Sequence, residues 1–153
     1  MKRRDFLTSA GVSGAAAFAA FSSRARGASA AEWNEAERVS VKLVTDFCAA
    51  WSSRDMNKVL PFLSDECVYR MTETTPPVNG HDGVIQRLKT PVESSSLVEF
   101  RILDTMAAGP IVINHRIDRF LMKPPLTWEG VGVFFVKDGK IKEWSDYTIR
   151  VQR

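Results

Sequence analysis

The sequence predicts an α+β domain in which N-terminal helices wrap one face of a curved sheet that is antiparallel or mixed. Two observations predict it: amphipathic segments dominate the first half of the chain, and four extended runs rich in Val, Ile, Phe and Leu fill positions 97–150. Helices followed by a succession of strands are typical of α+β proteins, whose helices lie on one side of the sheet. Such a sheet and its helices can enclose an apolar pocket.

Three helices are expected before the run of strands. The first covers positions 32–54, where apolar residues recur three or four positions apart. Asp55 is suited to cap a short second helix, and Asp82 to the first turn of a third helix that opens at Gly80. The apolar residues that face the core from these helices are Val44, Phe47, Cys48 and Trp51, then Val59, Leu60, Phe62 and Leu63, then Val84, Ile85 and Leu88.

Strands are expected where β-branched and aromatic residues cluster between turn signals. The first spans 67–71 and is stopped by Pro76-Pro77. The later four span 97–106, 111–122, 127–137 and 140–150. The turns between them are Ala108-Gly109-Pro110, Lys123-Pro124-Pro125 and the hairpin signal Lys137-Asp138-Gly139-Lys140.

The first 30 residues differ from the rest and resemble an export signal. Arg3 and Arg4 precede Phe-Leu, a weakly apolar run spans 6–21, and Ala28-Ser29-Ala30 supplies the small residues that a signal peptidase reads. The apolar run is shorter than the roughly 20 residues that a membrane span needs. We therefore expect a twin-arginine-type signal peptide over 1–30, cleavage near Ala30, a periplasmic or secreted domain over 31–153, and no stable membrane anchor.

The positive charge of the chain lies in this expected signal. The chain has 21 basic and 18 acidic residues, and five of the basic and one of the acidic residues belong to the first 30. The remaining 123 residues therefore carry 16 basic and 17 acidic residues, a net charge of −1. Nucleic-acid binding needs a one-sided basic surface and loses its support. Scattered cations such as Arg87 and Lys89 are expected to lie on solvated faces.

The motifs that most cofactor and metal sites need are missing from the sequence. It has no Gly-rich phosphate loop, no His-Glu-x-x-His motif, no metal-ligand cluster and no nucleophile elbow. His81 precedes a helix, where solvent contact is expected, and His115 points to the opposite face of its strand from Arg116. Cys48 and Cys67 have no redox or metal spacing. The sequence leaves open whether they form a disulfide or remain thiols, a buried thiol being the commoner role for Cys48.

Period-two alternation places charges on the apolar faces of two late strands. Asn114, Arg116 and Asp118 share one face, and Asp146 shares a face with Trp144. A buried charge is tolerated only when it is paired, so we expect Arg116 to lie between the two carboxyl groups. Unequal environments then let one carboxyl hold a proton while the other is ionised, which gives an acid and a base together. The alternative is a purely structural ion pair.

A set of residues spread over positions 35–150 forms a wider pattern. Its members are Tyr69, Pro76-Pro77 with Gly80-x-Asp82, Arg116-x-Asp118, Gly132-Val133-Phe134, Asp138-Gly139-Lys140-Ile141 and Trp144-x-Asp146-Tyr147. Together they resemble the limonene-1,2-epoxide hydrolase family, which belongs to the NTF2-like, SnoaL-like class of curved-sheet domains. Arg-x-Asp alone is a weak motif, and Trp-x-Asp-Tyr at the spacing of the final strand makes it more specific.

The resemblance implies a one-step hydrolysis of a small apolar epoxide to a vicinal diol, with no cofactor, no metal and no covalent intermediate. By matching position, Asp146 is the base that takes a proton from the attacking water, and Asp118, kept protonated, donates to the epoxide oxygen. Arg116 bridges the two carboxyl groups, and Tyr69 helps to fix the water. The resemblance also implies a homodimer through the outer face of the sheet.

The sequence departs from the family pattern at one position. Two residues after the strand tyrosine the family has an asparagine that also grips the water, and here the residue is Met71, whose thioether is a weak acceptor. Asn114 shares a face with Arg116 and is a candidate to compensate. The side chains expected to line the substrate pocket are Met71, Asn114, Trp128, Phe134 and Trp144.

Two other functions remain open at this point. An isomerase or cyclase of the ketosteroid-isomerase or polyketide-cyclase type uses acid–base carboxylates in the same fold, and a non-catalytic domain would bind an apolar ligand. Met71 favours both alternatives, whereas the grouping of Arg116 with two aspartates favours the hydrolase. In each case the expected partners are a small apolar ligand and water, and not nucleic acid.

Overall fold

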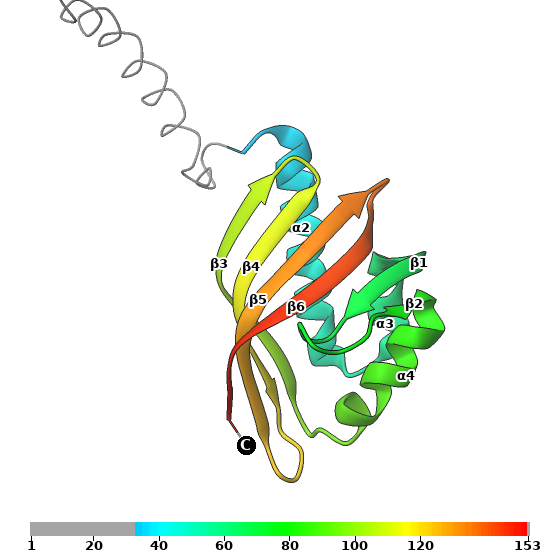
Figure 1. The fold of residues 1–153 in the computed structure, drawn as a ribbon, viewed down its shortest axis with the longest axis vertical. Helices are drawn as coiled ribbons and strands as arrows, with labels where there is room; N and C mark the ends of the chain where they lie inside the picture. Colours follow the sequence, from blue (N-terminus) through cyan, green and yellow to red (C-terminus); the bar gives the residue numbers. More distant parts are fainter. Residues whose placement is uncertain (1–32, 153) are drawn as a thin grey trace, which may run out of the picture.

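The structure, a computed structural model, describes residues 33–152 (Figure 1). The expected signal segment, 1–30, lies outside the described residues. The helical elements are α2 (Glu35–Ala50), the 3-10 turn η1 (Trp51–Ser53), α3 (Met56–Val59), the 3-10 turn η2 (Leu60–Phe62) and α4 (Gly80–Glu93). The strands are β1 (Leu63–Arg70), β2 (Val78–Asn79), β3 (Val98–Ala108), β4 (Ile111–Phe120), β5 (Leu126–Lys137) and β6 (Lys140–Gln152).

Six strands form one mixed sheet in the order β2-β1-β6-β5-β4-β3. Strands β3 to β6 follow one another as antiparallel neighbours, whereas β1 runs parallel to β6 and pairs Tyr69 with Trp144. The long strands curve, with α2 packed against β3 and β4 and α4 against β1 and β2 (Figure 1). The predicted α+β class with a curved sheet is confirmed. No helix within residues 33–152 is long and apolar enough to cross a bilayer.

Most boundaries agree with the expected ones, and the differences have local causes. Helix α2 begins after Asn34, whose side chain accepts from the Glu37 amide while the Glu37 carboxylate accepts from the Asn34 amide, a reciprocal cap that fixes the start. Asp55 caps α3 as expected, through the Asn57 amide. Leu63, expected in the second helix, instead begins β1, because η2 ends at Phe62 and the backbone of Leu63 is extended. The two-residue β2 was not anticipated.

The core lies between α2 and the concave face of the sheet. Phe47 of α2 packs edge-on against Trp51, Phe134 and Trp144, with ring centroids 5.0–5.9 Å apart. Edge-to-face contacts of this kind add to the burial of large apolar area. Cys48 and Cys67 are both buried and unpaired, so the chain holds two thiols and no disulfide between them. Burial raises the pKa of each thiol to about 12.

Candidate active site

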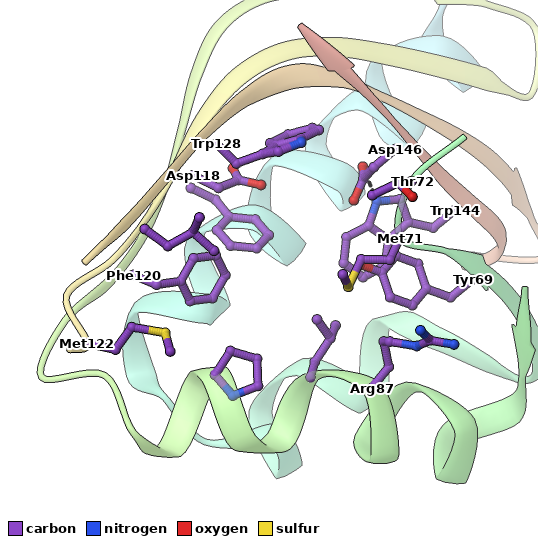
Figure 2. Close-up of a pocket in the computed structure, with 14 residues that line it drawn as sticks. Tyr69, Met71, Thr72, Arg87, Asp118, Phe120, Met122, Trp128, Trp144 and Asp146 are labelled. Carbon is purple, nitrogen blue, oxygen red and sulfur yellow. Dashed lines mark hydrogen bonds between the residues drawn. The ribbon is translucent and has the colours of Figure 1, made fainter. Parts of the chain in front are cut away.

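A cavity of about 250 Å³ lies between α4 and the concave side of the sheet (Figure 2). Helix α4 contributes one wall, and strands β1, β3, β4, β5 and β6, with the residues that follow β1 and β4, contribute the others. The wall is apolar except for a few side chains that carry oxygen or nitrogen. The lining residues are Tyr69, Met71, Thr72, Arg87, Leu88, Pro91, Phe100, Asp118, Phe120, Met122, Leu126, Trp128, Trp144 and Asp146.

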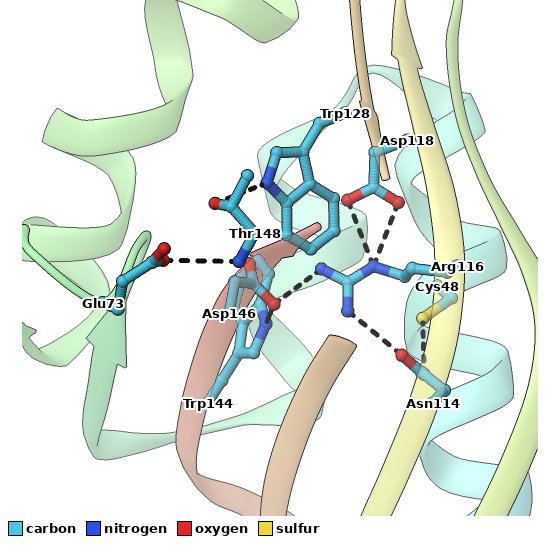
Figure 3. Close-up of polar contacts among 9 residues, drawn as sticks. All are labelled: Cys48, Glu73, Asn114, Arg116, Asp118, Trp128, Trp144, Asp146 and Thr148. Carbon is cyan, nitrogen blue, oxygen red and sulfur yellow. Dashed lines mark hydrogen bonds and ion pairs between the residues drawn. The ribbon is translucent and has the colours of Figure 1, made fainter. Parts of the chain in front are cut away.

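Arg116 joins the two acidic residues of the cavity wall (Figure 3). Its Nε donates to both carboxyl oxygens of Asp118, at 3.0 and 3.1 Å, and its Nη2 donates to Asp146 Oδ1 at 2.7 Å. The alternation of β4 points Arg116 and Asp118 to the same side, and the pairing of β5 with its two neighbours brings Asp146 across from them. The structure therefore unites the three charges that the sequence predicts to lie together.

The burial of this group raises the pKa of both carboxyls. Arg116 is 0% exposed, Asp118 4% and Asp146 5%. Burial raises the pKa of Asp118 to about 7, because the nearby charge of Asp146 adds to desolvation and outweighs the pull of Arg116. Burial also raises the pKa of Asp146, against hydrogen bonds from Arg116 and Trp144 that favour its ionised form. Two coupled carboxyls whose pKa values are both raised hold protons at a higher pH than exposed aspartates do.

The guanidinium of Arg116 is held by aromatic rings as well as by the carboxyls. Its central carbon lies 5.0 Å from the Trp128 ring centroid and 5.3 Å from that of Phe100, within cation–π range. Gly132 on β5, which pairs with Asn114, leaves the space that the guanidinium occupies, because an added Cβ there would lie 1.9 Å from Arg116 Nη1. Gly130 makes similar room for the Trp128 ring.

Asp146 and Tyr69 meet around the indole of Trp144. Trp144 Nε1 donates to Asp146 Oδ1 at 2.7 Å, the same oxygen that Arg116 contacts, so Oδ2 is left without a hydrogen bond among the described residues. The Tyr69 ring stacks on Trp144 with centroids 4.0 Å apart. Burial raises the pKa of Tyr69 well above its ordinary value, so its hydroxyl stays neutral and able to donate.

Two residues expected in the pocket lie elsewhere. Asn114 is 0% exposed and is absent from the cavity wall; its Oδ1 accepts from Arg116 Nη1 at 3.1 Å and its amide nitrogen donates to Cys48 Sγ at 3.7 Å. Phe134 is likewise fully buried, behind the wall and among core rings. Both expectations are wrong, because sharing a strand face with a wall residue does not fix the depth at which a side chain ends. Met71, Trp128 and Trp144 do line the cavity.

Two polar residues of the wall were missed from the sequence. Arg87, expected on a solvated face, is half-buried and lines the cavity, since Arg87, Leu88 and Pro91 present one side of α4 to it. The four-residue spacing between Arg87 and Pro91 was the available signal. Thr72 lies just beyond the end of β1, where alternation no longer applies, and its hydroxyl is 2.5 Å from that of Thr75. Lys89 is exposed, as expected.

A chain of hydrogen bonds ties the loop after β1 to the far wall (Figure 3). Trp128 Nε1 donates to Thr148 Oγ1 at 3.1 Å, and the Thr148 amide donates to Glu73 at 3.3 Å. The loop that carries Met71 and Thr72 is thereby linked to the indole that covers Arg116. Within residues 33–152, no three His, Cys, Asp or Glu side chains lie close enough together to bind a metal ion.

Solved structures of several other proteins share this architecture. An epoxide hydrolase of the LEH-like kind from M. tuberculosis is 26% identical, with a TM-score of 0.62 over 73% of this chain and 84% of that one. A candidate polyketide cyclase from Xanthomonas campestris is 17% identical, with a TM-score of 0.63 over 74% and 92%. A protein from Catenulispora acidiphila with a ketosteroid-isomerase-like fold is 16% identical, with a TM-score of 0.62 over 69% and 84%. The latter two share the fold only.

These neighbours have the NTF2-like fold, in which a mixed, curved sheet and a few helices enclose a pocket, and they include proteins of different chemistry. The sequence profile of the SnoaL-like domain matches residues 44–144, from the middle of α2 to the middle of β6. The matched range contains Tyr69, Arg116 and Asp118 and ends at Trp144. The chain therefore belongs to the SnoaL-like domain family.

Proposed function

We propose that this protein hydrolyses a small, mainly apolar epoxide to a vicinal diol by general acid–base catalysis. The observation that carries the proposal is the bridge from Arg116 to Asp118 and Asp146 in the wall of an apolar cavity. A proton-bearing carboxyl and an ionised carboxyl are the two groups that water addition to an epoxide requires. Only the epoxide oxygen and the water need polar partners, which suits a wall that is otherwise hydrophobic.

Asp146 is the proposed base and Asp118 the proposed acid. Asp146 Oδ2 accepts a proton from a water molecule as that water attacks one epoxide carbon. The carbon–oxygen bond breaks, and the electron pair remains on the epoxide oxygen, which takes the proton of Asp118. Asp146 then holds a proton and Asp118 does not, so transfer of one proton back to Asp118 restores the starting state.

Arg116 and Tyr69 have supporting roles in this proposal. Arg116 contacts both carboxyls, so it keeps their separation fixed and offsets the negative charge that passes from one to the other. The Tyr69 hydroxyl has no hydrogen-bond partner among the described residues and lies on the cavity wall, where it is placed to bond the attacking water. The 26% identical LEH-like epoxide hydrolase supports this assignment.

An isomerase or cyclase reaction is the second candidate, and Met71 is the observation that favours it. Met71 lines the cavity at the position where the hydrolase pattern places an asparagine that holds water. A proton shuttle between two carboxyls would serve either reaction. A binding domain without catalysis would keep the cavity but would have no use for the proton on Asp118.

Diol formation in isotope-labelled water separates these candidates. Purified protein is incubated with terpene, cyclic and steroid epoxides in H₂¹⁸O, and the mass of each product is measured by mass spectrometry. A hydrolase places one ¹⁸O atom in the diol, whereas an isomerase or cyclase step places none in a new hydroxyl. Absence of labelled diol from every epoxide class would refute the proposed hydrolysis.

The pH dependence of kcat/KM is expected to be bell-shaped. Asp118 must hold its proton, so the rate falls as pH rises through its pKa of about 7. Asp146 must be ionised, and its pKa is raised, so the acid limb lies above the ordinary aspartate value of 3.8. Asp118→Asn should remove the alkaline limb and lower the rate. A wild-type rate that still rises between pH 7 and pH 9 would contradict the acid role.

Replacing Met71 with asparagine is expected to speed hydrolysis. Met71 is 37% exposed, so the asparagine would not be a buried polar group without a hydrogen-bond partner. Its amide offers the attacking water a donor and an acceptor, which a thioether lacks. The gain in kcat is up to about 100-fold if the water is poorly held in the wild type. Met71→Leu, which adds no polar group, is the control and should leave kcat unchanged. If the kcat of the asparagine variant is no higher than that of the leucine variant, Met71 does not limit the rate of hydrolysis.

We also propose that the protein acts outside the cytoplasm as a homodimer. The alternation that points Trp144 and Asp146 inward points Tyr147 to the outer face of β6, and both Tyr147 and the nearby Ile149 are exposed. Exposed apolar side chains grouped on one face favour association. Sedimentation of the domain without residues 1–30 tests the dimer, and cell fractionation tests the location.

A further inference from the structure

Arg87 is a cation in the wall of a mainly apolar cavity, and it has no role in the proposed hydrolysis. It is half-buried on α4 and has no hydrogen bond or ion pair with any residue between 33 and 152. Figure 2 shows it across the cavity from Asp118 and Trp128, with its guanidinium directed to the Tyr69 end. Burial raises the pKa of Tyr69, and the charge of Arg87 is one of the influences that lower it.

In the state that the proposed hydrolysis requires, with a proton on Asp118, the charges of the cavity do not cancel. Arg116 and ionised Asp146 form a neutral pair, and Asp118 is neutral when it holds its proton. Arg87 then remains as the single uncompensated charge of the wall among the described residues. An apolar ligand that fills the cavity would displace water from the part of Arg87 that faces the cavity without offering a hydrogen bond in exchange, and even partial desolvation of an unpaired cation has a cost.

We propose that the natural substrate is amphiphilic, with an apolar body that carries the epoxide and one carboxylate that pairs with Arg87. A carboxylate fits the planar fork of a guanidinium with two hydrogen bonds. A dianionic phosphate would leave one of its charges without a partner, because the wall offers a single free cation. The cavity of about 250 Å³ is below the roughly 300–1,000 Å³ of pockets for drug-sized ligands, so the body is compact, such as one ring with a short acidic arm.

This inference deepens the proposed function and names its substrate class, but its first test does not depend on turnover. Cyclohexaneacetic acid and cyclohexaneacetamide have the same shape and differ in charge. Their dissociation constants are measured by calorimetry at pH 6, where the acid is ionised and Asp118 holds its proton. The wild type is expected to bind the acid about 10- to 100-fold more tightly than the amide, the range of a hydrogen bond to a charged group.

The variants locate this preference. Arg87→Gln should bring the affinity for the acid down to that for the amide and leave the amide unchanged. Lys89→Gln removes the same charge from an exposed position of the same helix, where Lys89 pairs with Glu93, and should keep the preference. The inference is overturned if the wild type binds both probes alike or neither, if Arg87→Gln weakens both equally, or if Lys89→Gln has the effect of Arg87→Gln.

The rate of epoxide hydrolysis provides the second test. The 3,4-epoxide of cyclohexaneacetate is compared with that of cyclohexaneacetamide, and the acid should have the higher kcat/KM in the wild type but not in Arg87→Gln. Preferential binding of the acid probe with no hydrolysis of either epoxide would leave the role of Arg87 intact and refute the hydrolase. Hydrolysis of both epoxides at equal rates would support the hydrolase and refute the role of Arg87 in selecting the acid.

Discussion

Asp146→Asn is expected to lower kcat for diol formation by about 10²–10⁴-fold, the usual contribution of a general base. The change replaces the carboxylate oxygen that has no partner in the wall with an amide nitrogen, which cannot take a proton from water. The other oxygen stays an acceptor for Arg116 Nη2 and Trp144 Nε1, both now at 2.7 Å. The loss therefore comes from chemistry rather than from the position of the side chain.

The fold is expected to survive this substitution, although it becomes less stable. Removing one charge of a buried ion pair leaves the other charge poorly compensated, which costs about 3–5 kcal/mol when the partner is deleted outright. Here Arg116 keeps Asp118, which can ionise more readily once Asp146 is neutral. The near-ultraviolet circular dichroism, which reports the rings around Trp144, should match that of the wild type.

Asp46→Asn is a matched control, because Asp46 lies on α2 in an exposed pair with Lys42. It changes the same charge far from the cavity and should leave kcat unchanged. If Asp146→Asn hydrolyses epoxides within threefold of the wild-type rate while its circular dichroism is unaltered, Asp146 is not the base.

The sequence predicts the charged group because alternation along a strand is a strict rule. Arg116 and Asp118 are two residues apart on β4, and Asp146 is two residues from Trp144 on β6, so each pair must share a face. Apolar neighbours then indicate that this face is buried. The parallel pairing of β1 with β6 does not follow from such a rule, because it joins strands more than 70 residues apart and depends on how α4 crosses over.

Depth within the domain is the second property that alternation does not encode. Asn114 and Asp118 lie on the same face of β4, yet Asp118 reaches the cavity and Asn114 ends behind Arg116 against Cys48. The difference arises because α2 covers one part of the sheet directly, whereas α4 stands off from the other part and leaves a cavity. Arg87 was misjudged for the same reason, since its helix face meets a cavity rather than solvent.

Gly132→Ala is expected to impair stability and catalysis together, although it adds one methyl group. That group would lie 1.9 Å from Arg116 Nη1, 2.8 Å from a ring carbon of Phe134 and 3.0 Å from Asn114 Oδ1. Arg116 cannot move away from the added methyl group, because it is fully buried and hydrogen-bonded to three side chains. Overpacking of this kind costs about 1–3 kcal/mol or more. Any shift that relieves it moves the guanidinium away from one carboxyl, so kcat should fall at least about 100-fold, as misplacement of catalytic groups by about 1 Å does.

A double-mutant cycle attributes the clash to Arg116. In an Arg116→Met background the long guanidinium is absent, so Gly132→Ala should cost much less free energy of unfolding than it does in the wild type, as measured by urea denaturation. Val133→Ala, on the same strand but pointing to the other face, should leave kcat near the wild-type value. Equal costs of Gly132→Ala in both backgrounds would mean that the glycine serves the backbone of β5 and not the arginine. The cycle therefore tests whether the sequence Gly-Val-Phe of β5 exists to seat the cation that joins the two carboxyls.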